Sequence, residues 1–288
     1  MEGLIIKGIA GFYYVKTHDG KVYQCKARGL FKKKGITPFV GDNVIFEILE
    51  DGDGIIDEIL PRKNQYIRPP IANIDMFVVV TSATSPQPNP RVIDKFLVMA
   101  EKSQAEIILC VNKIDIATKE EIENLKDIYE NIYKMIFVSG EKSIGIEQLR
   151  NALSKKKTAF AGPSGVGKST LINKLEPRMN LETGEISAKT NRGKHTTRHV
   201  EIFDMSFGGM IFDTPGFTAF DVLEAEAAEL QFLYPEMDDY IGECRFDNCR
   251  HLKEPGCAVL NAKDKGDIHN SRYESYKSQM EEIINQKK

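Results

Sequence analysis

Two short motifs contain the residue types that bind a nucleotide, and they occur in an unusual order. Asn112 to Asp115 reads N-K-I-D, and Gly162 to Ser169 reads G-P-S-G-V-G-K-S. The second is a phosphate-binding loop, in which backbone amides surround the phosphates while the lysine reaches the β- and γ-phosphates and the serine binds Mg²⁺. In the first, a carboxylate can accept both the N1 and the N2 protons of guanine. Together the motifs predict a guanine-nucleotide site.

A third motif completes the set. Asp213 to Gly216 reads D-T-P-G and follows an apolar run, so we expect Asp213 to help hold Mg²⁺ and the Gly216 amide to contact the γ-phosphate. In ordinary GTPases D-x-x-G separates the phosphate loop from a later N-K-x-D. Here the order is base reader, phosphate loop, γ-phosphate sensor. A circularly permuted G domain gives this order.

We assign separate roles to the residues of these motifs. Asp115 selects guanine, Asn112 ties its loop to the phosphate loop or to the base carbonyl, and the stem of Lys113 covers the ring. Ser169 and Asp213 are the expected Mg²⁺ ligands. The predicted nucleotide-binding set is Asn112, Lys113, Asp115, Gly162, Pro163, Ser164, Gly165, Val166, Gly167, Lys168, Ser169, Thr170, Asp213 and Gly216.

The first switch, with candidate catalytic groups, is expected between the phosphate loop and D-x-x-G, in residues 183–199. Thr196 or Thr197 is expected to close on Mg²⁺ and the γ-phosphate, and both assignments stay open. His195 either helps orient the attacking water or is an ordinary exposed histidine. Phe217 stands where many GTPases carry a water-positioning glutamine. We therefore expect slow unaided hydrolysis, accelerated by a partner or by a rearranged switch.

A cysteine-rich segment near the C-terminus indicates a metal site. Three thiols and one imidazole lie within 14 residues, which completes a tetrahedral zinc shell with no open position for water. The alternative is a set of buried free cysteines beside a chance histidine. We expect one structural Zn²⁺ per chain, bound by Cys244, Cys249, His251 and Cys257.

Bulk composition limits the class of protein. The 288 residues suggest two or three domains, and 41% hydrophobic residues suffice for real cores. No apolar run is long enough to cross a membrane and no signal peptide is evident, so we expect a cytoplasmic protein without membrane association. A net charge of −3 argues against a purely electrostatic nucleic-acid binder but allows a local basic surface. Cys25 and Cys110 are expected to be ordinary buried thiols.

Three regions follow one another along the chain. Residues 1–65 show alternating strands at 4–10, 12–17, 22–27, 43–49 and 54–59, which favour a five-stranded barrel of the oligonucleotide-binding (OB) type. Residues 66–220 alternate buried strands with helices, as in an α/β domain with a parallel sheet. Residues 221–288 predict a mainly α zinc domain with an acidic helix at 224–232 and a closing helix at 273–284.

Two further features bear on partners. Arg28 to Gly35 reads as a basic loop with one aromatic, and is either a solvated loop or a contact for an RNA backbone. Ser139-Gly140 is either the loop that backs the base or a plain turn. Because the barrel is expected to bind RNA but to touch no phosphate, we expect deletion of residues 1–65 to remove most of the stimulation by a partner and little of the basal rate of hydrolysis.

Over nearly its whole length the chain resembles the bacterial small-ribosomal-subunit biogenesis GTPases of the circularly permuted kind. The resemblance rests on the three motifs above, on Gly193 to Thr197, and on the cysteine segment through Val259. It implies an OB barrel that binds rRNA, a permuted G domain and a zinc domain. It also implies GTP hydrolysis to GDP stimulated by the small ribosomal subunit during late maturation. Lys194 and Arg198 depart from the family pattern. We expect a monomer.

The permuted order has a mechanical implication, because D-x-x-G runs directly into the zinc domain. We expect the GTP form to dock both flanking domains on RNA and hydrolysis to loosen one of them. Two alternatives stay open: a nucleotide-gated RNA-binding scaffold with incidental hydrolysis, and an ATP-driven RNA remodeller. Asp115 speaks against the second, because adenine lacks the donor pair that this carboxylate accepts.

Overall fold

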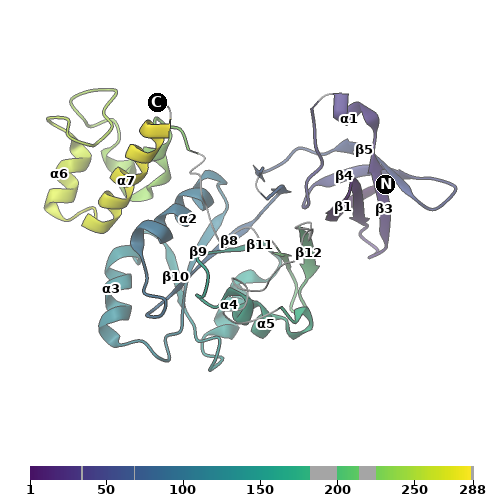
Figure 1. Cartoon of the computed structure of the whole chain (residues 1–288), viewed down its shortest axis with the longest axis horizontal. Coiled ribbons are helices and arrows are strands. Elements are labelled where there is room, and N and C mark those ends of the chain that lie inside the picture. Colours follow the sequence, from purple (N-terminus) through teal and green to yellow (C-terminus); the bar gives the residue numbers. More distant parts are fainter. Residues whose placement is uncertain (34, 68, 182–199, 214–224, 287–288) are drawn as a thin grey trace. The chain divides into compact units, whose positions relative to one another are not determined.

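The computed structural model describes residues 1–33, 35–67, 69–181, 200–213 and 225–286 (Figure 1). They form two compact units. One contains the described residues of Met1–Phe77, Arg150–Phe160 and Glu185–Phe217, and the other contains the described residues of Val78–Leu149, Ala161–Gly184 and Thr218–Lys288. The predictions for His195, Thr196, Thr197, Gly216 and Phe217 lie outside the described residues.

The N-terminal strands close into a five-stranded barrel, as predicted. Their order is β1-β2-β3-β5-β4, and β1 also pairs with β4, which closes the barrel. Alternate residues point inward, and Ile5, Val15 and Phe46 are completely buried. Cys25 is a buried thiol whose pKa burial raises to about 11. The strands are β1 (Glu2–Ile9), β2 (Phe12–Lys16), β3 (Val22–Ala27), β4 (Asn43–Ile48) and β5 (Gly54–Ile59).

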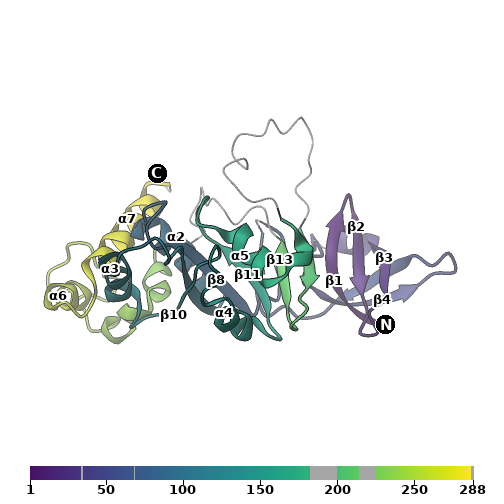
Figure 2. The same cartoon turned by 90° about the horizontal axis from the view of Figure 1, so that it is seen from below.

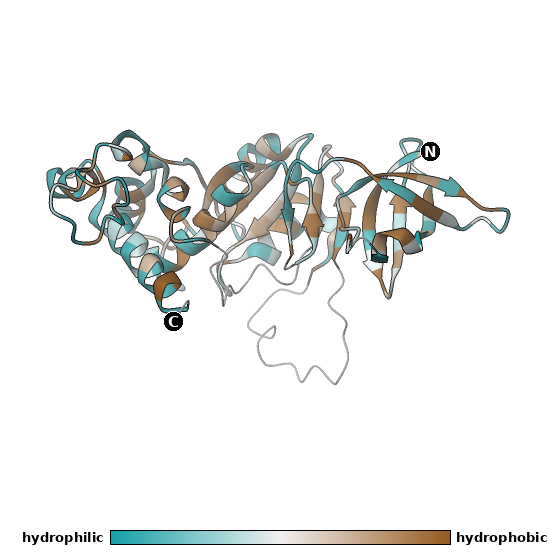
Figure 3. Cartoon of the chain, turned by 90° about the horizontal axis from the view of Figure 1, so that it is seen from above, coloured by the Kyte–Doolittle hydropathy of each residue, from teal (hydrophilic) through white to brown (hydrophobic). Residues whose placement is uncertain are grey.

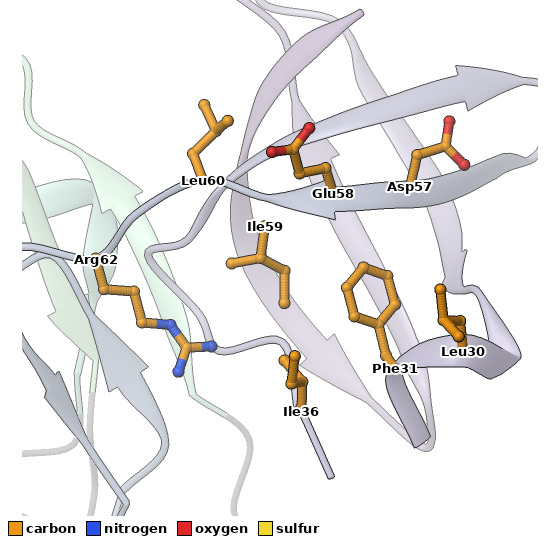
Figure 4. Close-up of a pocket in the computed structure, with 8 residues that line it drawn as sticks. All are labelled: Leu30, Phe31, Ile36, Asp57, Glu58, Ile59, Leu60 and Arg62. Atoms are coloured by element: carbon orange, nitrogen blue, oxygen red, sulfur yellow. The ribbon is translucent and has the colours of Figure 1, made fainter. Parts of the chain in front are cut away.

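The basic segment after β3 differs from the predicted loop, because it contains the short helix α1 (Gly29–Lys33). Arg28 does not project freely: its guanidinium donates to Asp57 and, at 3.2 Å, to Glu47. Two apolar side chains of α1 line a pocket of about 410 Å³ against β5 (Figure 4). The pocket residues are Leu30, Phe31, Ile36, Asp57, Glu58, Ile59, Leu60 and Arg62.

Strand β1 pairs with strands of the barrel and also with a strand outside it. Its first half pairs with β4, the register with β2 shifts between Ile5 and Lys7, and Lys7 then pairs with Glu201 of β12 (Glu201–Asp204). Strand β12 pairs in turn with β13 (Met210–Asp213), which is parallel to β11 (Lys157–Ala161). The barrel therefore continues the sheet that carries Asp213 (Figure 2), so deletion of residues 1–65 would also remove the strand that pairs with β12.

The other unit contains strands in the order β10-β9-β8, of which β10 and β9 are parallel. All residues of β8 are buried, and apolar residues fill the strands while loops are hydrophilic (Figure 3). None of the described helices combines the length and apolar character needed to cross a membrane. The elements are β8 (Met76–Ser82), β9 (Glu106–Asn112), β10 (Lys134–Phe137), α2 (Pro90–Lys102), α3 (Lys119–Tyr129) and α5 (Lys168–Leu175).

Several helix starts are fixed by local sequence. Asn89 caps α2, and Thr118 and Glu121 form a reciprocal capping box at the start of α3. Cys110, inside β9, is fully buried, and burial raises the pKa of its thiol to about 12. The remaining elements are α4 (Ile146–Leu153), η1 (Pro177–Met179), β6 (Gln65–Tyr66) and β7 (Ile71–Ala72).

The C-terminal region is mainly helical, with η3 (Leu230–Leu233), η4 (Pro235–Tyr240), α6 (Ala258–Lys265) and α7 (Asn270–Gln286). The predicted acidic helix at 224–232 is wrong in its described part, where turns lead into the 3₁₀ helix η3. Val98 of α2 belongs to the same hydrophobic core as Tyr234, Tyr276 and Met280. The C-terminal region thus packs on α2, and its core does not depend on a metal alone.

Arg272 of α7 occupies the centre of this packing and has no exposed side-chain surface. Its guanidinium donates to Asp94 of α2 at 2.6 Å and to both carboxylate oxygens of Glu236 at 2.6 and 3.0 Å. It also lies 4.6 Å from the ring centroid of Tyr234. Burial raises the pKa of Asp94, although the positive charge of Arg272 acts to lower it. A fully buried cation therefore joins three elements.

Candidate nucleotide site and metal centre

The phosphate loop lies between β11 and α5 and contains two glycines at which any side chain would be strained and would lie too close to a neighbour. Gly162 has φ of 141°, and a Cβ there would lie 2.2 Å from the carbonyl oxygen of Val80. Gly167 caps α5 with φ of 95°, and its Cβ would lie 2.4 Å from Nδ2 of Asn112. A glycine cap offers no side-chain acceptor, so the first amides of α5 are left for an anion.

Asn112 joins three loops at the end of β9. Its buried side chain donates from Nδ2 to the carbonyl of Val166 at 2.8 Å and accepts from the amide of Gly140 at 3.0 Å. Of the two alternatives expected for Asn112, this contact is the bond to the phosphate loop. Gly140 also lies against Thr170. The N-K-x-D loop, the phosphate loop and Ser139-Gly140 are thus held in one arrangement.

Two lysines reach into the phosphate loop. Lys168 donates to the carbonyls of Gly162 at 2.7 Å and Pro163 at 2.6 Å, and burial lowers its pKa to about 8. Lys113 donates to the carbonyls of Gly165 at 2.8 Å and Ser85 at 2.5 Å. Neutral carbonyls do not balance two cations, so an anion bound here would be favoured.

Ser85 is a contact that the sequence reasoning missed. It belongs to the loop after β8, and Pro86 of the same loop is the nearest neighbour of the position that a Cβ on Gly165 would occupy. The available signal was that ligands of open α/β sheets bind beyond the carboxyl ends of the strands. Asp115 and Ser164 are exposed, while Ser169 is partly buried in the first turn of α5.

Asp213 ends β13, directly after the buried Phe212. Burial is the main cause that raises its pKa, and the negative charge of Glu201, its partner on β12, adds to the effect. A bound cation would offset both. The serine hydroxyl and aspartate carboxylate predicted to bind Mg²⁺ are hard oxygen donors, which this ion prefers.

The four predicted zinc ligands meet in one cluster, with all ligand atoms within 4.8 Å of one another. Nδ1 of His251 lies 3.5 Å from Sγ of Cys244 and 3.3 Å from Sγ of Cys257, and these two sulfurs are 3.9 Å apart. Ligands about 2.0 to 2.3 Å from a tetrahedral zinc have separations of this size. Burial raises the pKa of the Cys257 thiol to about 12, a cost that metal binding to the thiolate would remove.

Surrounding groups orient these ligands. Nε2 of His251 lies 2.8 Å from Oε1 of Gln231 in η3, so the ring donates there and presents the Nδ1 lone pair to the sulfurs. Backbone amides of Ala258 and Leu260 donate to the sulfurs of Cys244 and Cys257 at 3.3 and 3.4 Å. These contacts are typical of a structural metal centre. Gln231 was not found from the sequence.

Comparison with known families decides the class. The family described as RsgA GTPase matches residues 59–223, and the one described as RsgA N-terminal domain matches residues 2–56. This chain belongs to the RsgA GTPase family. As a member of this family it is a GTP-hydrolysing enzyme, and the ATP-driven alternative is dropped.

Full-length relatives and solved structures agree with the RsgA assignment. Proteins named small ribosomal subunit biogenesis GTPase RsgA from Alkaliphilus metalliredigens and Carboxydothermus hydrogenoformans are 45% and 46% identical over 285 residues, 98% of this chain and 97% and 98% of theirs. YjeQ from Thermotoga maritima superposes with a TM-score of 0.87 at 33% identity, covering 98% of each chain. YloQ, described as a circularly permuted GTPase, gives 0.82 at 36% identity, covering 100% of this chain and 96% of its own. The predicted fold class is confirmed.

Proposed function

We propose that this chain binds the small ribosomal subunit and acts in its late maturation, hydrolysing GTP to GDP and phosphate with stimulation by the subunit. The names of its relatives support the subunit as partner. The bond from Asn112 to Val166 carries the nucleotide assignment, because it joins the guanine-reading loop to the phosphate loop. We propose that the chain works as a cytoplasmic monomer and contacts rRNA through its barrel, residues 1–65, with residues 66–220 as G domain and 221–288 as zinc domain.

We propose that each motif residue acts as its type and place suggest. Asp115 reads the guanine edge, Lys168 binds the β- and γ-phosphates, and Ser169 with Asp213 holds Mg²⁺. Lys168 donates to two loop carbonyls, and we expect its ammonium group to donate to phosphate oxygens when nucleotide is bound. His195 with Thr196 or Thr197 would complete the site from the first switch.

Replacement Asp115→Asn is expected to shift preference from GTP towards xanthosine triphosphate, because an amide can donate to the extra carbonyl of xanthine but loses a guanine bond. GTP binding should weaken by about 1.5 to 3 kcal/mol, the scale of a hydrogen bond to a charged group. Competition titration of a fluorescent guanine nucleotide measures both affinities. Asp239→Asn, at an exposed carboxylate of η4, is the control. Unchanged GTP affinity without a gain for xanthosine triphosphate would contradict the assignment.

We also propose that the Cys₃His cluster binds one structural Zn²⁺, separate from the Mg²⁺ that accompanies GTP. Gln231→Ala should lower zinc affinity about 10- to 100-fold, because the bond that fixes the His251 ring is lost. Gln231→Glu keeps an acceptor and should retain most of the affinity. Competition with a chromophoric chelator measures zinc release. Equal affinity in wild type and Gln231→Ala would show that this bond does not support the site.

A further inference from the structure

Three charged residues form a row across the strands that join the barrel to the G-domain sheet. Lys7 of β1 lies opposite Glu201 of β12, and Glu201 lies opposite Asp213 of β13. Directly opposed residues of antiparallel strands project from the same face. Nζ of Lys7 is 2.6 Å from Oε2 of Glu201, and these side chains are 30% and 27% exposed. The row therefore begins in the barrel and ends at the proposed Mg²⁺ ligand.

The charges in this row alternate in a way that affects a cation at Asp213. Glu201 places a second negative charge beside Asp213. The two carboxylates repel each other, and together they attract a divalent cation. Lys7 neutralises Glu201 and reduces that attraction. Removal of the Lys7 charge should therefore raise the affinity for a cation at Asp213, and removal of the Glu201 charge should lower it.

We propose that Lys7 is a positioning residue that sets the Mg²⁺ affinity of the nucleotide site through Glu201. This rests on the proposed role of Asp213. Because part of the Lys7 side chain is exposed, an RNA phosphate bound to the barrel can compete with Glu201 for its ammonium group. The released carboxylate then strengthens Mg²⁺ binding at Asp213. Barrel occupancy is thereby converted into tighter retention of the Mg²⁺-nucleotide complex.

A charge cycle on the full chain tests this coupling. The readout is the Mg²⁺ concentration that half-maximally slows dissociation of a fluorescent GDP analogue. Lys7→Met should lower that concentration and Glu201→Gln should raise it, each by about three- to tenfold, from Coulomb's law for partly solvated charges. The double variant restores the net charge of the row and should lie within about twofold of wild type by the same reasoning.

Lys16→Met is the matched control. Lys16 of β2 also forms an ion pair with a residue of β12, Asp204. The residue opposite Asp204 on β13, however, is the apolar Met210. Loosening of the barrel would affect this variant as much as Lys7→Met, whereas the charge effect would leave its Mg²⁺ midpoint unchanged. Equal shifts in both lysine variants, or shifts of the same sign in Lys7→Met and Glu201→Gln, would overturn the proposal.

Asp213→Asn separates the inference from the proposed function. If it abolishes the Mg²⁺ dependence while the Lys7 and Glu201 variants match wild type, the coupling is wrong and the ligand assignment stands. If Asp213→Asn itself retains the wild-type Mg²⁺ midpoint, the ligand assignment is wrong and the coupling falls with it.

Discussion

Purified small ribosomal subunits are expected to accelerate phosphate release from GTP by roughly 10³ to 10⁵, the range over which supply of a missing group or ordering of a switch changes GTPase rates. The reason is Phe217, which follows Asp213 to Gly216 and cannot orient water by hydrogen bonding. The chain alone should therefore be slow. Multiple-turnover assays with and without subunits measure the effect. Equal rates, or equal stimulation by large subunits, would disprove the partner.

The contribution of the barrel to this stimulation is better tested by a substitution than by a deletion. Loss of residues 1–65 removes β1 and with it the strand that pairs with β12, so a lost response would not report RNA contact alone. Lys33→Glu reverses one exposed charge of α1 while the barrel stays closed. We expect weaker stimulation at limiting subunit concentration and an unchanged basal rate.

Arg272→Met is expected to destabilise the chain by about 3 to 5 kcal/mol, the usual cost of removing one partner from a buried ion pair. The side chains of Asp94 and Glu236, 0% and 8% exposed, would then lack the cation that pairs with them. Arg272→Lys should also be costly, because an ammonium group cannot make the two parallel bonds to Glu236. Urea unfolding followed by circular dichroism is the measurement, since the chain contains no tryptophan.

Lys95→Met provides the control for this experiment. Lys95 of α2 pairs with Glu282 of α7 at 2.7 Å, so it joins the same two helices as Arg272 and Asp94, but both side chains are partly exposed. A loss of about 1 kcal/mol or less is expected for such a pair. Similar losses in both variants would mean that burial of Arg272 adds little to the docking of α7.

The sequence predicted features that depend on local chemistry. The bounds of β3 and β5 match their predicted ranges, because alternation and glycine placement act over a few residues. The cysteine cluster was also found, since all its ligands lie close together in sequence. Helix α1 was missed because its lysines resemble those of a solvated loop, while its stabilising contacts reach β5, far along the chain.

Other errors came from contacts that no local pattern encodes. Gln231 bonds to His251, and Lys113 bonds to Ser85, across intervals without a recurring spacing. The ion pair of Lys7 with Glu201 could be predicted only by knowing that β1 pairs with β12 as well as with its partners in the barrel. The acidic segment at 224–232 has helical composition, but η3 is tightened where Leu230 enters the C-terminal core.

The pairing of β1 with β12 also constrains how the chain is made. Lys16 and Asp204 form an ion pair although they are 188 residues apart, so β1 and β2 leave the translating ribosome long before β12, the strand that β1 must pair with. Such long loop closure slows folding. Until then the free half of β1 presents unpaired amides and carbonyls to other chains. Protein produced rapidly at high temperature should therefore form strand-exchanged dimers or aggregates through this edge of β1 before it aggregates through other parts of the chain.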